Sequence, residues 1–201
     1  MKKTILGVAA IGMILLSAFT NGNHTEVYKV DTKTSSMEWF AEKVTGKHQG
    51  TIAFSTGEIK NDHGNLSGTF EVDMTTIACT DLTGEYKGKL ENHLKSDDFF
   101  GSVKYSKAKF VSTSITPIKE AKDGGFTHTV KGNLTIKEKT NEITFDAVIK
   151  SEAGKIACVG TAVVDRSKFD VKYGSKSFFS DLGDKAIYDE FKLKFNVVAV
   201  K

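Results

Sequence analysis

Apolar and polar residues alternate with a period of two along most of this chain. The segment 126–137 is the clearest case, since one of its faces carries only Thr, Lys and Asn side chains. The opposite face carries Phe126, His128, Val130, Gly132, Leu134 and Ile136. A period of two predicts half-buried antiparallel strands. The same alternation predicts eight strands, at 35–45, 47–58, 64–75, 106–117, 126–138, 142–150, 155–166 and 189–200.

One segment follows a helical period instead. Between residues 83 and 95, Tyr86, Leu90, His93 and Leu94 recur at helical spacing, which predicts one helix between the third and fourth strands. Turn-forming residues at 61–64, 123–125 and 140–141 separate neighbouring strands. Eight antiparallel strands with a single inserted helix predict an all-β barrel, because closure removes the exposed edges of an open sheet.

The first residues have the pattern of a secretory signal peptide. Lys2 and Lys3 precede an apolar run from Ile5 to Phe19, which is short for a bilayer span. We predict a signal peptide over residues 1–22 and a single barrel domain over residues 23–201. The mature protein is then expected to be periplasmic or secreted, and the alternative is an uncleaved N-terminal anchor.

Charges are balanced and interspersed along the chain. There are 28 Lys and Arg residues against 25 Asp and Glu residues, and loss of Lys2 and Lys3 leaves the mature chain nearly neutral. Nucleic-acid binding requires a basic surface, so we predict no nucleic-acid partner. After residue 22 the sequence has no second apolar run of transmembrane length, so we predict no stable membrane insertion. Neither the charges nor the apolar runs indicate an oligomeric state.

Cysteine and histidine spacing gives little support for catalysis or metal binding. The five histidines lie outside the close spacings typical of metal ligands, and the sequence has no Gly-x-Ser-x-Gly motif and no local Cys–His signature. We therefore predict no catalytic residue, no metal site and no cofactor. Cys79 and Cys158 could form one disulfide in an oxidising compartment, or remain as two partly buried free thiols.

The inward face of the predicted barrel mixes large apolar residues with very small ones. An eight-stranded barrel is either just filled by its side chains or holds one small ligand. Small inward residues such as Gly132 and Gly160 favour a cavity for an elongated apolar ligand; alternatively, large neighbours fill the gap. The candidate ligand-binding residues are Met37, Trp39, Lys43, His48, Ile52, Phe54, Phe70, Met74, His93, Phe110, Val130, Gly132, Phe145, Gly160, Phe191 and Phe195.

Three of these candidates are polar. The strand phase points Lys43 and His48 inward beside one hairpin, where they could select an anionic head such as a carboxylate or phosphate. His93, on the apolar stripe of the helix, could donate to a ligand head or fix the helix to the turn at 96–98. The Asp165–Arg166 pair could hold a phosphate, although such a pair is more often a structural salt bridge.

Several short motifs occur together between Val27 and Lys201. Residues 73–77 read Asp-Met-Thr-Thr-Ile, residues 93–100 read His-Leu-Lys-Ser-Asp-Asp-Phe-Phe, and Lys104-Tyr105 and Phe110 follow. With the segments 132–136 and 165–169, they resemble the signature of the YceI-like, polyisoprenoid-binding family. The resemblance implies a lipocalin-like barrel in the periplasm that holds an isoprenoid chain.

This chain also departs from the family pattern. Ser106 stands where the family usually has proline, Lys43 stands where it often has histidine, and His48 replaces an apolar residue. The mouth of the barrel is therefore expected to be more polar than in the family.

Three functions fit these features. The first is an exported carrier or storage protein for an amphiphilic, isoprenoid-like or fatty-acid-like lipid. The second is an enzyme that acts on a lipid in the same cavity, with Lys43, His48 or His93 as an acid–base group. The third is a structural or stress-related periplasmic protein whose barrel is filled.

Overall fold

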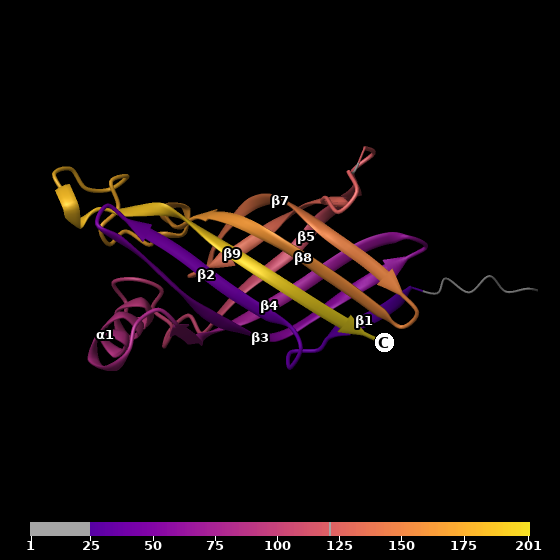
Figure 1. Ribbon diagram of the computed structural model, residues 1–201, viewed down its shortest axis with the longest axis horizontal. Coiled ribbons are helices and arrows are strands. Elements are labelled where there is room, and N and C mark those ends of the chain that lie inside the picture. The colour runs from indigo at the N-terminus through magenta and orange to yellow at the C-terminus, as the bar shows by residue number, and fades with distance from the viewer. Residues whose placement is uncertain (1–24, 121) are drawn as a thin grey trace, which may run out of the picture.

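The computed structural model describes residues 25–120 and 122–201 of the 201-residue chain. The predicted signal peptide, residues 1–22, lies outside the described residues. The described residues form nine strands and one α-helix, with two short 3₁₀ turns (Figure 1). The strands are β1 (Glu26–Val30), β2 (Ser36–Lys43), β3 (Gly46–Asp62), β4 (Asn65–Cys79), β5 (Lys107–Pro117), β6 (His128–Ile136), β7 (Lys139–Glu152), β8 (Lys155–Asp165) and β9 (Ile187–Val200). The helix is α1 (Gly84–Lys95), and the 3₁₀ turns are η1 (Arg166–Phe169) and η2 (Gly183–Lys185).

The strands close into an antiparallel barrel with eight positions. Their order is β1-β3-β2-β9-β8-β7-β6-β5-β4, and β4 also pairs with β3, which closes the ring. Strands β1 and β2 share one position, because both pair with β3 and with β9. β1 pairs with residues 58–61 of β3, and β2 pairs with residues 46–51 at the other end of the same strand. The predicted all-β barrel is confirmed.

The position of the helix in the strand order differs from the prediction. α1 lies between the fourth and fifth strands, not between the third and fourth. The difference arises from β1, which has only five residues and precedes the first predicted strand, 35–45. The helix itself is where the periodicity predicts it. Leu94 is buried on its packed face, but Tyr86 points outward and is 73% exposed.

Two hairpins turn through residues in the left-handed region. His63 and Gly64 have φ angles of 52° and 91° in the turn between β3 and β4. Lys137 and Glu138, at 49° and 62°, form the turn between β6 and β7. The expectation of a turn at 140–141 is therefore wrong, and both of those residues pair within the β6–β7 ladder. Paired positive φ angles match the twist of flanking strands, so the hairpin imposes a conformation that neither Lys nor Glu prefers.

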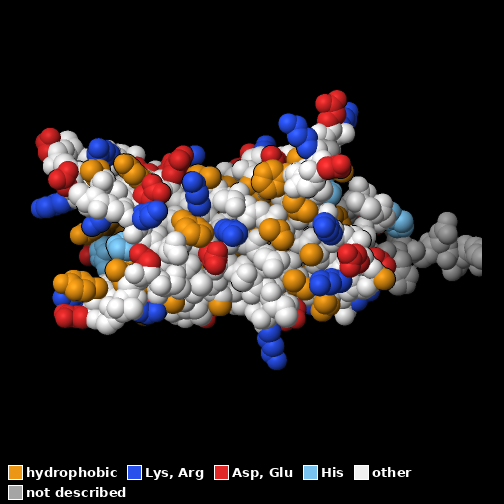
Figure 2. Space-filling model, in the orientation of Figure 1, with side chains coloured by type: hydrophobic (Ala, Val, Ile, Leu, Met, Phe, Trp, Pro, Cys, Tyr) orange, Lys and Arg blue, Asp and Glu red, His pale blue; other side chains and the backbone are white. Residues whose placement is uncertain are grey.

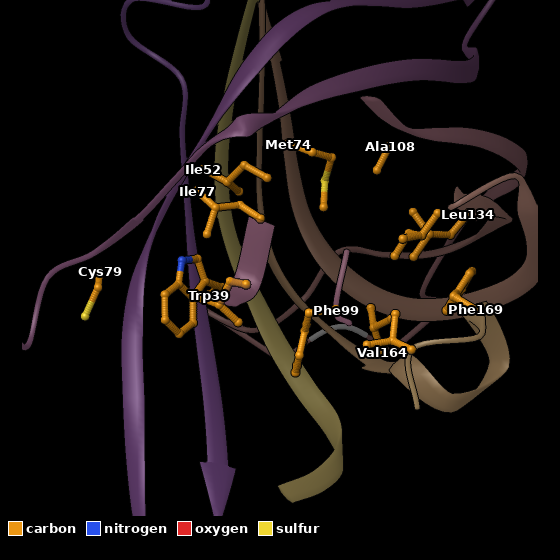
Figure 3. Close-up of a cluster of buried hydrophobic side chains, with 13 residues drawn as sticks. Trp39, Ile52, Met74, Ile77, Cys79, Phe99, Ala108, Leu134, Val164 and Phe169 are labelled. Carbon is orange, nitrogen blue, oxygen red and sulfur yellow. The ribbon is translucent and has the colours of Figure 1, made fainter. Parts of the chain in front are cut away.

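Buried apolar side chains close both ends of the barrel. At the end that carries α1, a cluster that includes Trp39, Ile52, Met74, Leu94 and Phe99 packs inside the barrel (Figure 3). We call it the helix-end cluster. The opposite end is closed by the far-end cluster, formed by Tyr28, Ile59, Ile156 and Ala199. Between them lies the mid-barrel cluster of Phe54, Ala162, Phe195 and Val197.

The outer surface carries mixed charges. On the face shown in Figure 2, acidic and basic side chains alternate without a single-sign patch. Within the described residues, the structure contains no helix of the length and apolarity needed to cross a membrane.

Candidate ligand-binding cavity

A cavity of about 180 Å³ lies inside the barrel, and its walls are almost entirely apolar. Inward-facing residues of all three apolar clusters contribute to it. Eleven of the sixteen candidate residues line it: Met37, Trp39, Ile52, Phe54, Phe70, Met74, Phe110, Val130, Phe145, Phe191 and Phe195. The structure therefore brings these side chains to one space, and their contact with a ligand stays a prediction.

Some walls of the cavity come from outside the predicted strand faces. Leu94 comes from α1, and Phe99 and Phe100 come from the turn that follows it. Their rings form a chain of edge contacts, with centroids 5.0 Å apart between Phe99 and Phe100 and 6.3 Å apart between Phe100 and Phe191. Strand alternation could not predict this wall, because its residues lie outside the strands. The only sequence signal for it was the Phe-Phe pair that ends the motif at 93–100.

His93 is not one of the residues that line the cavity. Its ring packs edge-on against Tyr173 at 4.4 Å and against Phe99 at 5.6 Å, and its Nε2 is buried without a hydrogen-bond partner. The carbonyl of His93 accepts hydrogen bonds from the backbone N–H and the hydroxyl of Ser96. These contacts support the role of fixing α1 to the turn at 96–98.

The prediction that Lys43 and His48 point into the cavity is wrong. Lys43 keeps its phase, since β2 pairs with β3 in unbroken register up to this residue, but it is the last residue of the strand and is exposed. His48 keeps a partly buried position, but its Nδ1 lies 2.9 Å from Asp81 Oδ2, outside the cavity lining. Lys43 and His48 therefore do not select the head group of a ligand inside the cavity.

Asp81 joins several elements at the helix end of the barrel. Its carboxylate accepts hydrogen bonds from the Gln49 backbone N–H at 3.0 Å and from the Cys79 thiol at 3.1 Å, besides its contact with His48. Burial raises the pKa of Asp81, but these hydrogen bonds and the His48 charge outweigh it, and the pKa is about 2. A depressed pKa means that the folded state favours the charged carboxylate.

Asp81→Asn is expected to lower the free energy of unfolding by about 1–2 kcal/mol at pH 7. The carboxylate contribution is present above the ordinary pKa of aspartate, 3.8, and is lost as the pH falls through about 2. The difference between wild type and variant should therefore shrink between pH 4 and pH 2. Urea unfolding at several pH values measures it, and Asp62→Asn, at an exposed hairpin position, is the control. A difference that does not change with pH would contradict this role.

Gly132 and Gly160 do not line the cavity, contrary to the prediction. A Cβ at Gly132 would meet the Phe110 ring at 2.4 Å, and one at Gly160 would meet the Phe195 ring at 2.7 Å. Large neighbours therefore occupy the space above both glycines. The two glycines therefore make room for the Phe110 and Phe195 rings and do not themselves border open space. The cavity lies elsewhere in the barrel interior.

Both cysteines are free, so the disulfide that the sequence left open is not formed. Cys79 is 0% exposed in the helix-end cluster, whereas Cys158 lines the cavity beside the mid-barrel cluster. Burial raises the pKa of the Cys158 thiol to about 12. Burial and the hydrogen bond to Asp81 raise the pKa of Cys79. Both groups are therefore protonated, unreactive thiols.

Unreduced protein is expected to react at both cysteines with iodoacetamide once it is denatured. In the folded protein at pH 8, the reaction should be at least about 100-fold slower, because the thiolate is the nucleophile. Mass spectrometry of the alkylated chain distinguishes the forms. A mass that shows neither cysteine alkylated after denaturation without reductant would restore the disulfide.

Arg166 is a charged residue at the edge of the cavity, and it is 2% exposed. Its Nη2 lies 3.3 Å from Asp189 Oδ1, and its guanidinium lies over the Phe99 ring at 5.4 Å. It also donates hydrogen bonds to four backbone carbonyls, those of Val171, Tyr173, Ile187 and Tyr188. The guanidinium is thus engaged by the protein, which supports the structural interpretation of this residue over phosphate binding.

Acid–base chemistry has little support inside the cavity. The candidate groups Lys43, His48 and His93 all lie outside its lining. Among the side chains that the structure describes, no group of three or more His, Cys, Asp and Glu residues is placed to hold a metal ion. The arrangement is suited to holding an apolar molecule.

Comparison with known proteins agrees with this fold. The model of the YceI-like domain matches residues 28–199. A UPF0312 protein of Photorhabdus laumondii is 30% identical over 190 residues, which cover 92% of each chain. A UPF0312 protein of Staphylococcus aureus is 35% identical over 124 residues, which cover 59% of this chain and 63% of that protein.

A solved structure shares the fold at low sequence identity. It is a polyisoprenoid binding domain from Saccharophagus degradans implicated in plant cell wall breakdown. It superposes with a TM-score of 0.58 at 12% identity, over 86% of this chain and 97% of that one. The motifs at 73–77 and 93–100, the barrel and the family match agree, and the chain belongs to the family of YceI-like domains.

Proposed function

We propose that this protein is an exported carrier or storage protein that holds the apolar chain of an isoprenoid-like or fatty-acid-like lipid. The observation that carries the proposal is the apolar cavity inside the barrel. Such a lining binds hydrocarbon by removing it from water and offers few groups for anything else. The signal-peptide pattern of residues 1–22 supports export to the periplasm or beyond.

The bound part of the ligand is expected to be uncharged. Lys43 and His48 lie off the cavity, and the Arg166 guanidinium is already engaged by backbone carbonyls and Asp189. A charged head placed inside would lose its hydration without gaining a partner, which costs several kcal/mol. We therefore place any charged head outside the barrel and the hydrocarbon chain within it.

The size of the cavity sets how much chain it takes. An engineered cavity of roughly 150 Å³ binds a benzene ring, so about 180 Å³ takes only a slightly larger hydrocarbon segment as it stands. Met37 and Met74 line the space, and unbranched methionine side chains adapt easily to a new neighbour. A longer chain is accommodated by rotation of such side chains.

Native mass spectrometry of the protein purified from its own host tests the proposal. A co-purifying lipid of constant mass supports it. Turnover of the added lipid would favour an enzyme, and a ligand-free mass that is unchanged by added lipid would favour a filled structural barrel.

Ala162→Leu is expected to reduce the affinity for an apolar chain by at least about tenfold, or 1.4 kcal/mol. Ala162 is buried and lines the cavity, so the larger side chain occupies space that the ligand needs. The single tryptophan, Trp39, also lines the cavity, and energy transfer from it to all-trans-retinol measures binding. Val163→Leu, on the outward side of the same strand and 47% exposed, should bind normally.

Thermal unfolding separates lost space from lost structure. Ala162→Leu should unfold within a few degrees of wild type, because the cavity absorbs the added carbons. Normal retinol affinity in this variant would place the ligand elsewhere.

A further inference from the structure

Two seams of the barrel are only partly closed by backbone hydrogen bonds. In the β7–β8 seam the ladder stops at Ala147 opposite Gly160, and η1 covers the rest, held there by a hydrogen bond from Asn141 to the Lys168 carbonyl. The β4–β5 seam has no such cover among the residues that the structure describes.

The β4–β5 ladder runs from Asp73 opposite Lys107 to Thr69 opposite Val111 and stops there. Yet β4 begins four residues earlier, at Asn65, and β5 continues to Pro117. Beyond the stop, residues 65–68 pair only with β3, and residues 112–117 pair only with β6. By contrast, β8 pairs with β9 along its whole length.

A β-bulge explains why the two strands separate at this point. The register of β5 against β6 shifts between Ser112 and Ser114, immediately after the last pair with β4. An extra residue bends its strand and increases the local twist, which directs the β5–β6 hairpin away from the β3–β4 hairpin. Figure 1 shows the two hairpins diverging at the end of the barrel opposite α1. We call the space between residues 65–68 and 112–117 the notch.

The cavity extends to the notch. Leu66 and Gly68 on one side, with Ser112 and Ile115 on the other, all belong to its lining. Leu66, Ser112 and Ile115 are also partly exposed to solvent, so they face both the cavity and the outside. One side-chain hydrogen bond crosses the notch, from the Gly68 N–H to Ser112 Oγ at 2.8 Å. It stands where backbone ladder bonds would otherwise continue.

The helix end is built differently. Leu94 and Phe99 are buried there, and the edge contacts from Phe99 through Phe100 to Phe191 cover the interior. The Arg166 hydrogen bonds hold the segment 171–188 against the same end. Opening this end would break many packed contacts, whereas widening the notch breaks one hydrogen bond between the two hairpins.

We propose that the notch is the opening through which the apolar chain enters and leaves the cavity, and that the Gly68–Ser112 hydrogen bond is its latch. The inference rests on the proposed function. It assigns α1 to permanent closure of one end, not to a moving lid. The hairpin tips swing apart to admit the chain end-on, and the bond re-forms behind it or around its head.

Crosslinking across the notch tests this path. Ser67 and Thr113 are exposed on its two sides, so Ser67→Cys with Thr113→Cys can be joined by a short bis-maleimide, in a background of Cys79→Ser and Cys158→Ala. Energy transfer from Trp39 to all-trans-retinol, in stopped flow, gives rates of loading and release. The crosslink is expected to slow both by at least about tenfold, with little change in equilibrium affinity. The same variant capped with N-ethylmaleimide is the control for modification.

Two further crosslinks show whether the effect belongs to the notch. Val148→Cys with Val159→Cys spans the laddered part of the β7–β8 seam, where these two residues are paired, and should leave the rates unchanged. His93→Cys with Tyr173→Cys joins α1 to the segment 171–188, where the two rings are 4.4 Å apart, and should also leave them unchanged. Slowing by this helix-end crosslink, or normal rates with the notch closed, would overturn the proposal. Absence of retinol binding in the uncrosslinked protein would instead overturn the proposed function, and the entry path with it.

A separate variant tests the Gly68–Ser112 hydrogen bond as the latch. Ser112→Ala removes the hydrogen bond without adding bulk and is expected to speed loading and release several-fold. Ser114→Ala, two residues along and exposed, should have no effect. Equal rates for Ser112→Ala and wild type would remove the latch from the proposal.

Discussion

Gly50→Ala is expected to lower the free energy of unfolding by at least about 3 kcal/mol. Gly50 lies where three strands meet, opposite Trp39 of β2 and Cys79 of β4. An added Cβ would lie 1.8 Å from the Ala78 carbonyl oxygen and 2.6 Å from two indole carbons of Trp39. The indole cannot simply move aside, because its Nε1 donates a hydrogen bond to that same carbonyl at 3.2 Å. Relief therefore requires the backbone of two strands to separate.

Urea unfolding measures this loss, and Gly88→Ala is the matched control. Gly88 lies within α1, and nothing stands within 4 Å of the position of its added Cβ. Alanine there should stabilise the protein by about 0.5–1 kcal/mol, since glycine is a poor helix former. The fluorescence emission of Trp39 should also shift in Gly50→Ala, because the added methyl group displaces the indole ring from its packed position. A loss below about 1 kcal/mol for Gly50→Ala would mean that the strands adapt more easily than close packing allows.

Strand periodicity predicted most of the barrel because each long strand has one buried face. β6 occupies 128–136 where the sequence predicted 126–138, and β9 occupies 187–200 where it predicted 189–200. β1 was missed because five residues give too short a pattern. Its pairing is set by the far ends of β3 and β9, which the local sequence does not reveal.

The predictions for the polar residues of the candidate site were wrong for a different reason. Phase counting gives the face that a residue occupies, not its distance from the end of the barrel, and Lys43 keeps its phase but is exposed as the last residue of β2. His48 kept its phase, but its ring is taken by Asp81, 33 residues away. A side chain with a hydrogen-bonding tip follows its partner, and the partner depends on tertiary structure. The apolar candidate residues remained on the cavity side, where the phase placed them.

The glycines show the same limit for packing. The phase placed Gly132 and Gly160 on the inward side, and the structure puts the rings of Phe110 and Phe195 over them. Alternation shows which face a residue occupies, but not which neighbour fills the space above it. The remaining cavity therefore depends on how all the large side chains pack together, which no single strand determines.

Arg166→Leu is expected to lower the free energy of unfolding by about 3–5 kcal/mol, which is a large share of the stability of a domain of this size. The substitution leaves the Asp189 carboxylate without its buried cation, which lies 3.3 Å away. It also removes the donors to the backbone carbonyls of Val171 and Tyr173, at 2.8 and 2.9 Å, and of Ile187, at 3.1 Å. Buried acceptors left without donors lose more than the bond itself contributed.

Arg166→Lys separates the charge from the geometry. Lysine keeps the positive charge near Asp189, but its compact ammonium cannot reach carbonyls on both sides as the planar guanidinium does. We expect it to recover less than half of the loss. Lys168→Met, one residue beyond Ser167 and exposed, should unfold like wild type. Hydrogen exchange should show faster opening of residues 171–188 in Arg166→Leu and slow opening of β8, because the guanidinium holds that segment to the barrel end. If Arg166→Lys matched wild type, the charge alone would account for the role of this residue, and the carbonyl contacts would carry little of the stability.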